Sequence, residues 1–223
     1  MKKILFTFCL LFILKIGYSQ NSNDYKNEIS IGVINLTKSP KNQEILFKNS
    51  NYLVPFSNLT YKRFFNERNA IRLTFYRPIN KSYDNSGGSL VYKGEYKEQV
   101  LKMGYEYIFK QKRLTPYFAI DFSYLKSSSF REAGGGIIAG NYNIIENEIK
   151  GFGLSPTIGI NYKIFKSIYI GFESNLNILK FNEEKITSTY QISTEPNEIR
   201  ITEKDDYLEY IFNPVVFLIK FKF

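Results

Sequence analysis

Carboxylates at alternate strand positions are the residues of this chain that could do acid–base chemistry. The chain has no histidine, which excludes Ser-His-Asp hydrolysis and the usual zinc and copper ligand sets. The candidates that remain are Glu106, Asp121 and Glu173. Cations occur in the same polar faces, at Lys62, Arg72 and Lys102. We interpret these residues as a buried salt-bridge network, and we expect no catalytic residue, no bound metal, no cofactor and no enzymatic activity.

Two other segments have the composition of a ligand site. The acidic run "TEKDDYLEY" carries Glu203, Asp205, Asp206 and Glu209, whose oxygens could bind calcium. The run lacks the fixed glycine and the spacing of a known calcium loop, so we favour a solvated acidic rim. The glycine-rich segments "DNSGGS" and "EAGGGIIAG" do not lead from a strand into a helix, which a phosphate-binding loop requires. We predict that both lie in flexible outer loops.

The elements that would position these residues are β-strands. Apolar and polar residues alternate about eight times over roughly ten residues each, and no window has a helical period. One predicted face is apolar and carries, among others, Ile29, Ile31, Leu59, Tyr61, Ile71, Phe75, Leu101, Met103, Tyr105, Phe118, Ile120, Phe122, Ile158, Ile170, Phe172, Phe217, Ile219 and Phe221. The opposite face carries the charged candidates together with Glu28, Gly104, Asn161, Gly171, Asn175, Lys220 and Lys222.

The connections between these strands alternate between long and short. Short turns are expected near residues 66–69, 109–114 and 165–167. Long polar segments are expected at residues 37–51, 81–96, around 131–140 and at 181–203. This alternation is typical of an all-β, antiparallel, up-and-down transmembrane barrel with short periplasmic turns and long extracellular loops.

Alternation alone leaves the direction of the apolar face open. In a soluble periplasmic or secreted barrel that binds a small apolar ligand, this face would point inward. The polar face favours the membrane alternative, because both charge signs and very small residues suit a narrow interior that side chains fill. The apolar face would then contact lipid, with Tyr61, Tyr105, Tyr107, Tyr124 and Tyr162 at the membrane interfaces.

The N-terminus is typical of an export signal. Lys2 and Lys3 precede the apolar run "ILFTFCLLFIL", and small residues follow at positions 17 and 19. We predict a signal peptide at residues 1–19, cleaved after Ser19, and one barrel domain at residues 20–223. Cleavage removes Cys9, the only cysteine, and leaves 27 basic and 21 acidic residues, a net charge of +6. This mild excess favours outer-membrane lipid and lipopolysaccharide as partners and not nucleic acid.

Prolines and the C-terminus complete the prediction. Because proline cannot donate to a strand ladder, we place Pro55, Pro78 and Pro116 near strand ends and expect a bulge or break at Pro156. The chain ends in "NPVVFLIKFKF", which alternates to its last residue. A final strand that must pair with the first strand explains this ordered ending.

These patterns resemble the small outer-membrane β-barrel family of Gram-negative bacteria, of the OmpA membrane-domain and OmpX type. The stretches that carry the resemblance are "YKRFFNERNAIRLTF", "GYEYIFKQKRLTPYFAIDFSY", "SPTIGINYKI", "YIGFESNLNI" and "FLIKFKF". The resemblance implies an exported, monomeric barrel whose terminal strand the outer-membrane assembly machinery recognises. It also implies functions that range from structural proteins to adhesins and lipid-modifying enzymes. We expect a non-enzymatic barrel with a filled interior and outward loops in a structural, adhesive or ligand-contact role.

Overall fold

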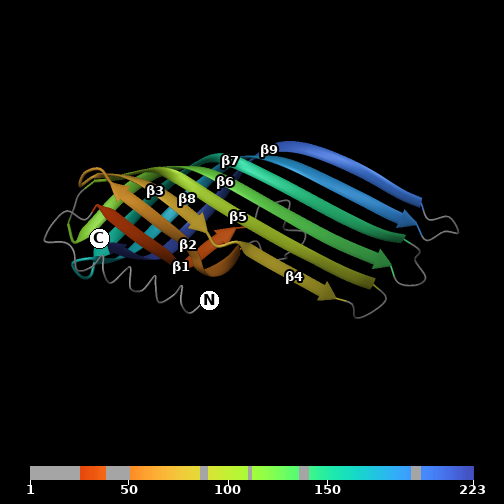
Figure 1. The fold of residues 1–223 in the computed structure, drawn as a ribbon, viewed down its shortest axis with the longest axis horizontal. Helices are drawn as coiled ribbons and strands as arrows, with labels where there is room; N and C mark the ends of the chain where they lie inside the picture. Colours follow the sequence, from red (N-terminus) through yellow and green to blue (C-terminus); the bar gives the residue numbers. More distant parts are fainter. Residues whose placement is uncertain (1–25, 39–50, 86–89, 110–111, 136–140, 192–196) are drawn as a thin grey trace, which may run out of the picture.

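The computed structural model of the chain is built of antiparallel β-strands (Figure 1). It describes residues 26–38, 51–85, 90–109, 112–135, 141–191 and 197–223. The strands are β1 (Asn27–Lys38), β2 (Asn51–Phe64), β3 (Asn69–Tyr76), β4 (Ile79–Asn85), β5 (Leu90–Ile108), β6 (Leu114–Gly135), β7 (Asn141–Lys163), β8 (Ile168–Gln191) and β9 (Asn197–Lys222). Within these ranges, no helix has the length and hydropathy to span a membrane. The predicted signal peptide lies outside the described residues.

The strands close into a ring. Strands that follow one another in the chain pair, apart from β3 and β4, and in addition β1 pairs with β9 and β3 with β5. The strands β3 and β4 follow one another along β5, separated by Arg77 and Pro78, and so occupy one place in the wall. The ring therefore has eight places, and the predicted up-and-down barrel is confirmed.

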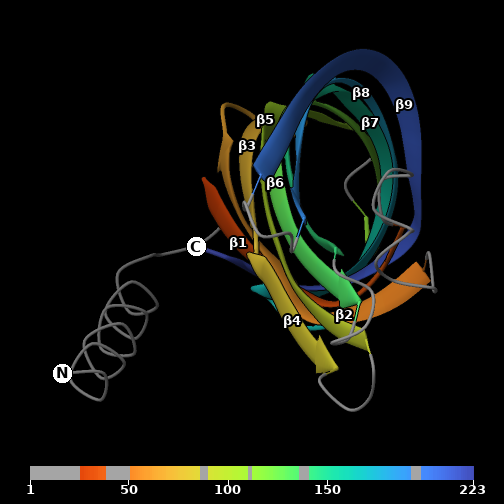
Figure 2. The same cartoon turned by 90° about the vertical axis from the view of Figure 1, so that its right-hand side faces the viewer.

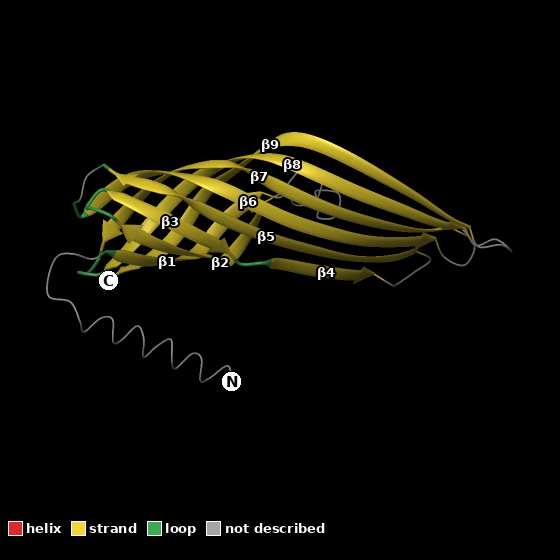
Figure 3. Cartoon of the chain, turned by 45° about the horizontal axis from the view of Figure 1, so that its top comes forward, coloured by secondary structure: helices red, strands yellow, loops and turns green. Residues whose placement is uncertain are grey.

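The C-terminal strand closes the barrel as predicted. Ile31 pairs with Ile219 and Ile29 with Phe221. The backbone N–H of Asn27 donates to the carbonyl of Phe223 at 2.9 Å, and the N–H of Phe223 donates back at 2.9 Å. The last residue of the chain is thus held by the first strand. The short turns lie at this same end of the barrel (Figure 3).

The apolar face points outward and the polar face inward. The outward-facing large apolar residues include Leu59, Ile71, Phe75, Met103, Phe122, Ile158, Phe172 and Ile219, all more than a third exposed. On β6 this apolar band runs from Leu114 to Tyr124, which matches the roughly 9–11 residues of a transmembrane strand. The predicted tyrosines lie on the outer face too. A soluble ligand-binding barrel requires the apolar face to point inward, so this alternative is wrong for this chain.

A ladder of charges ends the apolar band on the outer face. Lys126 on β6 and Lys150 on β7 lie opposite each other in the strand register. The Glu148 carboxylate lies 3.0 Å from the Lys126 ammonium and 3.2 Å from that of Lys150. On the next two strands Lys180 lies 3.6 Å from Asp206. Hydrogen bonds from the two lysines hold the pKa of Glu148 below its ordinary value. The change from apolar to charged side chains marks the boundary of the band.

Most of the segments predicted as long loops are strand. β4 and β5 pair as far as Asn85 and Tyr92, β6 and β7 as far as Gly134 and Tyr142, and β8 and β9 as far as Gln191 and Asn197. Both faces of this part lie beyond the apolar band, so the alternation that marks a half-buried strand is lost although the ladder continues. The segment at residues 39–50 lies outside the described residues.

Six strands project beyond the closed ring as a curved sheet. The pairing of β1 with β9 ends at Leu36 and Val215, whereas β9 pairs with β8 along its whole length apart from one bulge. At the other side, β4 pairs with β5 alone. The sheet from β4 to β9 therefore has two edges, and it arches as seen along the barrel (Figure 2).

The prolines lie at irregular points of this ladder. Pro78 separates β3 from β4 and Pro116 is near the start of β6, as predicted. β7 pairs with β8 at Leu154 and again at Thr157 but not at Pro156 between them, which confirms the expected break. The placement of Pro55 at a strand end is wrong. β2 continues to Asn51, and Pro55 pairs with Ile34 directly after a register shift between Gly32 and Ile34.

Candidate functional site

The interior of the closed ring is filled by an ion network centred on Arg72. Its guanidinium lies 3.0 Å from the Asp121 carboxylate, 3.3 Å from that of Glu106 and 3.4 Å from that of Glu173. Arg72 is 4 % exposed. Strand alternation places all four side chains on inward faces, although they come from β3, β5, β6 and β8. The sequence candidates therefore converge on one cation.

Lysines supply the remaining counter-charges. The Lys62 ammonium lies 2.6 Å from Glu106 and 3.1 Å from Glu28. Lys220 lies 3.5 Å from Glu173, and Lys222 lies 3.8 Å from Glu28. Four cations thus face four carboxylates within the described part of the interior. This confirms a buried salt-bridge network, since each carboxylate is held by a cation.

Tyr117 joins two parts of the network and was not singled out in the sequence. Its hydroxyl donates to Glu173 at 2.5 Å and accepts from the Lys220 ammonium at 3.0 Å. The ammonium groups of Lys62 and Lys220 lie 4.9 and 4.6 Å from the centre of its ring. The ring fits because β7 has Gly159 beside it. A Cβ there would lie 2.3 Å from ring atoms. Tyr117 lies between Pro116 and Phe118, which point outward, so strand alternation predicts that its side chain points inward.

The acidic run lies on β9. Alternation places Asp206 on one face of the strand and the other three carboxylates on the opposite face. Glu203 lies 3.1 Å from the Lys185 ammonium, and Asp206 accepts a hydrogen bond from Asn182 at 2.6 Å. In the part of the chain that the structure describes, no group of three acidic, histidine or cysteine side chains is placed to hold a metal. The glycine-rich segments are for the most part outside the described residues.

A layer of amides and hydroxyls lies inside the barrel, on the side of the ion network that faces the projecting sheet. Asn177 accepts hydrogen bonds from the Lys102 ammonium at 2.5 Å and from Ser155 at 2.6 Å, and it donates to the carbonyl of Ile211 at 3.2 Å. Asn175 accepts from Lys102 at 3.3 Å. Neutral groups thus hold Lys102, so its expected place in the salt-bridge network is wrong, whereas the other interior cations face carboxylates.

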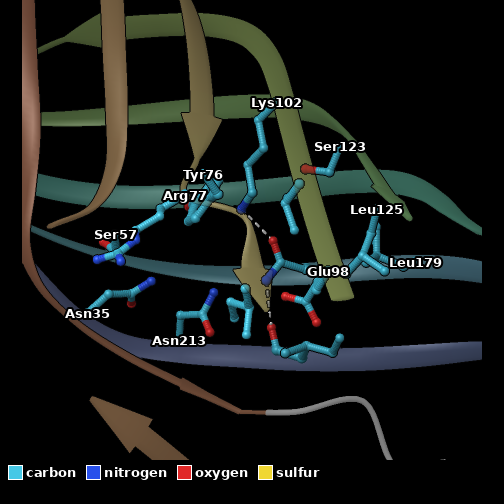
Figure 4. Close-up of a pocket in the computed structure, with 14 residues that line it drawn as sticks. Asn35, Ser57, Tyr76, Arg77, Glu98, Lys102, Ser123, Leu125, Leu179 and Asn213 are labelled. Atoms are coloured by element: carbon cyan, nitrogen blue, oxygen red, sulfur yellow. Dashed lines mark hydrogen bonds between the residues drawn. The ribbon is translucent and has the colours of Figure 1, made fainter. Parts of the chain in front are cut away.

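Lys102 and Asn177 of this layer also line a pocket (Figure 4). Lys102 and Asn213 belong to its polar side, and apolar side chains form the opposite side. These apolar residues are Val100, Leu125, Leu179 and Ile211. Three of them belong to a buried cluster with Ile149 and Phe181 on the inner face of the projecting sheet. The pocket therefore combines the cations Lys102 and Arg77 and the carboxylate Glu98 with a hydrocarbon surface. The sequence did not predict it, because its lining comes from eight strands.

Solved structures of outer-membrane proteins share this architecture at low sequence identity. No protein-family model and no curated protein matches the sequence. A major outer membrane protein from Thermus thermophilus has a similar structure, with a TM-score of 0.54, 9% identity and coverage of 89% of this chain and 98% of that one. The outer membrane protein OprG from Pseudomonas aeruginosa has a TM-score of 0.51, 13% identity and coverage of 90% of this chain and 98% of that one.

Both similarities extend over nearly the whole of the known chains, and at these identities they establish the fold. The structure of this chain agrees with the sequence prediction in the closed ring and the antiparallel up-and-down order of its strands. The resemblance inferred from the sequence patterns is thereby confirmed at the level of architecture. This chain has the fold of the small outer-membrane β-barrel proteins.

Proposed function

We propose that the chain is a non-enzymatic integral outer-membrane protein whose barrel is sealed and whose projecting sheet extends outside the cell for contact with a surface partner. The observation that carries this proposal is the contrast between the two faces of the ring. The outer face is an apolar band that ends in charges, and the inner face is a salt-bridged network. An apolar outer face is stable in contact with lipid. Within lipid, a β-sheet satisfies all of its backbone hydrogen bonds only when it closes into a barrel.

The filled interior supports a role other than passive diffusion of solutes. The Arg72 network spans side chains of four strands, Lys62 and Lys220 extend it to β2 and β9, and Tyr117 adds further bonds. Opening a water-filled path would separate these charges. We therefore expect the barrel to exclude solutes as large as sugars.

Contact at the cell surface is supported by the edges of the projecting sheet. Residues 197–213 of β9 pair with β8 on one side and with no described strand on the other. Exposed apolar side chains on this segment include Ile199 and Ile201. A strand edge with exposed apolar groups favours binding of another chain. An adhesive or structural role is therefore proposed before an enzymatic one.

A lipid-modifying enzyme is the less favoured alternative. Its carboxylates would be Asp121 and Glu173, which lie in ion pairs with Arg72. Replacing either residue by alanine should leave the lipid profile of the envelope unchanged wherever the protein folds. A changed profile with folded protein would instead support the enzyme.

Four measurements test the proposal. Envelope fractionation should place the protein in the outer membrane as a monomer, and heated and unheated samples in detergent should migrate differently on a gel. N-terminal sequencing of the mature chain should begin at Gln20. Liposomes that contain the purified protein should not swell in sugar solutions. Extraction without detergent would overturn the membrane location, and swelling would overturn the sealed interior.

A further inference from the structure

The pocket lies where the wall of the barrel is interrupted. The pairing of β2 with β3 ends at Asn58 and Tyr76, and the N–H of Arg77 makes the last bond, to the carbonyl of Ser57 at 2.7 Å. Beyond this point β2 pairs with β1 and β4 pairs with β5, with no bridge between β2 and β4 in the described residues. Ser57 and Ile79, which line the pocket, stand on the two sides of the interruption.

The pocket contains a buried cation without a counter-ion. Lys102 is 3 % exposed. Among the described residues, no carboxylate oxygen lies within 4.0 Å of its ammonium, in contrast to Lys62, Arg72 and Lys220. A buried ammonium held by neutral groups alone is costly, and a bound anion offsets that cost.

Two further polar groups lack partners in the same pocket. The hydroxyl of Ser57 and the side-chain oxygen of Asn35 are buried and have no hydrogen-bond partner within the described part of the chain. A hydroxyl donates its proton, and an amide presents its NH₂ group when it is turned over. Both groups are therefore available to donate to an anion in the pocket that Lys102 lines.

The other side of the pocket suits hydrocarbon. Val100, Leu125, Leu179 and Ile211 line it. The cavity measures about 50 Å³, room for a head group but not for a whole amphiphile. The remainder of a ligand would lie along the apolar side chains of the projecting sheet.

We propose that this pocket binds a single-chain anionic amphiphile, a long-chain carboxylate, with its head group on Lys102, Asn35 and Ser57 and its first methylene groups against Leu125, Leu179 and Ile211. Glu98 also lines the pocket, and Tyr96 donates a hydrogen bond to it. Its negative charge disfavours a phosphate dianion and favours a monoanion. The site goes beyond the proposed surface role and does not depend on it.

The test is a binding titration of the folded protein in an uncharged detergent. The probe is a dansyl-labelled undecanoic acid, and its methyl ester is the uncharged control. The wild-type protein should bind one acid molecule saturably and the ester about tenfold or more weakly. Lys102→Met should lower the affinity for the acid to that for the ester. Lys102→Arg keeps the charge and should retain most of the binding. The matched control Lys126→Met, on the outer face, should change neither affinity.

Each sample is first checked for the heat-dependent gel shift, which tests the barrel and not the pocket. Should Lys102→Met lose that shift, Leu179→Asn is the second variant. It changes the apolar side and retains the cation, and it should weaken the acid and the ester alike. Equal affinities of the wild type for acid and ester, no saturable binding, or full affinity in folded Lys102→Met would overturn the proposal.

Discussion

Removing the Arg72 guanidinium is the sharpest test of the interior network. The substitution Arg72→Met keeps much of the side-chain volume and leaves three carboxylates around an uncharged group. Glu106 still has Lys62, at 2.6 Å, and Glu173 still has Lys220, at 3.5 Å. Asp121 has no other ion pair in the described residues. The main loss should therefore fall on Asp121.

The size of the effect follows from the distances. At 3.0 Å and an effective dielectric constant of about 20, Coulomb's law gives about 5.5 kcal/mol for the Arg72–Asp121 pair, before the desolvation of the two groups is subtracted. Breaking a buried pair by removing one partner destabilises proteins by about 3–5 kcal/mol. We expect Arg72→Met to lower the free energy of unfolding by that amount. Adding Asp121→Asn should recover about 1–3 kcal/mol, because the uncompensated carboxylate is removed.

The assay is urea unfolding of the barrel refolded in lipid vesicles. The chain has 18 tyrosines and no tryptophan, so tyrosine emission and the heat-dependent gel band are the signals. Lys126→Met breaks an exposed pair with Glu148 and should change the free energy of unfolding by less than about 1 kcal/mol, which makes it the matched control. Wild-type stability in Arg72→Met, or a further loss on adding Asp121→Asn, would refute the reasoning.

Three further predictions concern closure, packing and pH. Deleting residues 221–223 removes the reciprocal bonds between Asn27 and Phe223, so the truncated chain should lose the heat-dependent gel shift even when it is folded into lipid without assembly machinery; a retained shift would show that closure does not need these residues. Gly159→Ala should lower the free energy of unfolding by about 1–3 kcal/mol because the new Cβ displaces Tyr117, and an unchanged urea midpoint would contradict this. Lys126 and Lys150 hold the pKa of Glu148 below its ordinary value, so the stabilisation from this carboxylate is present above the unfolded pKa of glutamate and is lost as the pH falls through the lowered value. An NMR titration of the Glu148 side chain should show its pKa rising in Lys126→Met. An unchanged pKa would show that the hydrogen bond from Lys126 does not lower it.

Much of the membrane-spanning wall could be read from residue types alone. Leu101, Met103 and Tyr105 alternate with Lys102, Gly104 and Glu106, and only one register of a strand puts the first set in lipid and the second inside. The same argument placed Glu106, Asp121 and Glu173 in one interior with cations. The pairing of each carboxylate could not be read from alternation, since Arg72 meets residues 34 to 101 positions away.

The projecting sheet and the pocket were decided by the tertiary structure. Outside the apolar band both faces of a strand meet similar surroundings, so residues 181–203 have no period of two that would separate them from a loop, yet their backbone pairs almost throughout. The pocket depends on where β2 and β4 part and on which side chains of eight strands meet there. Local sequence determines which way a side chain points, whereas only the register of distant strands determines what it meets.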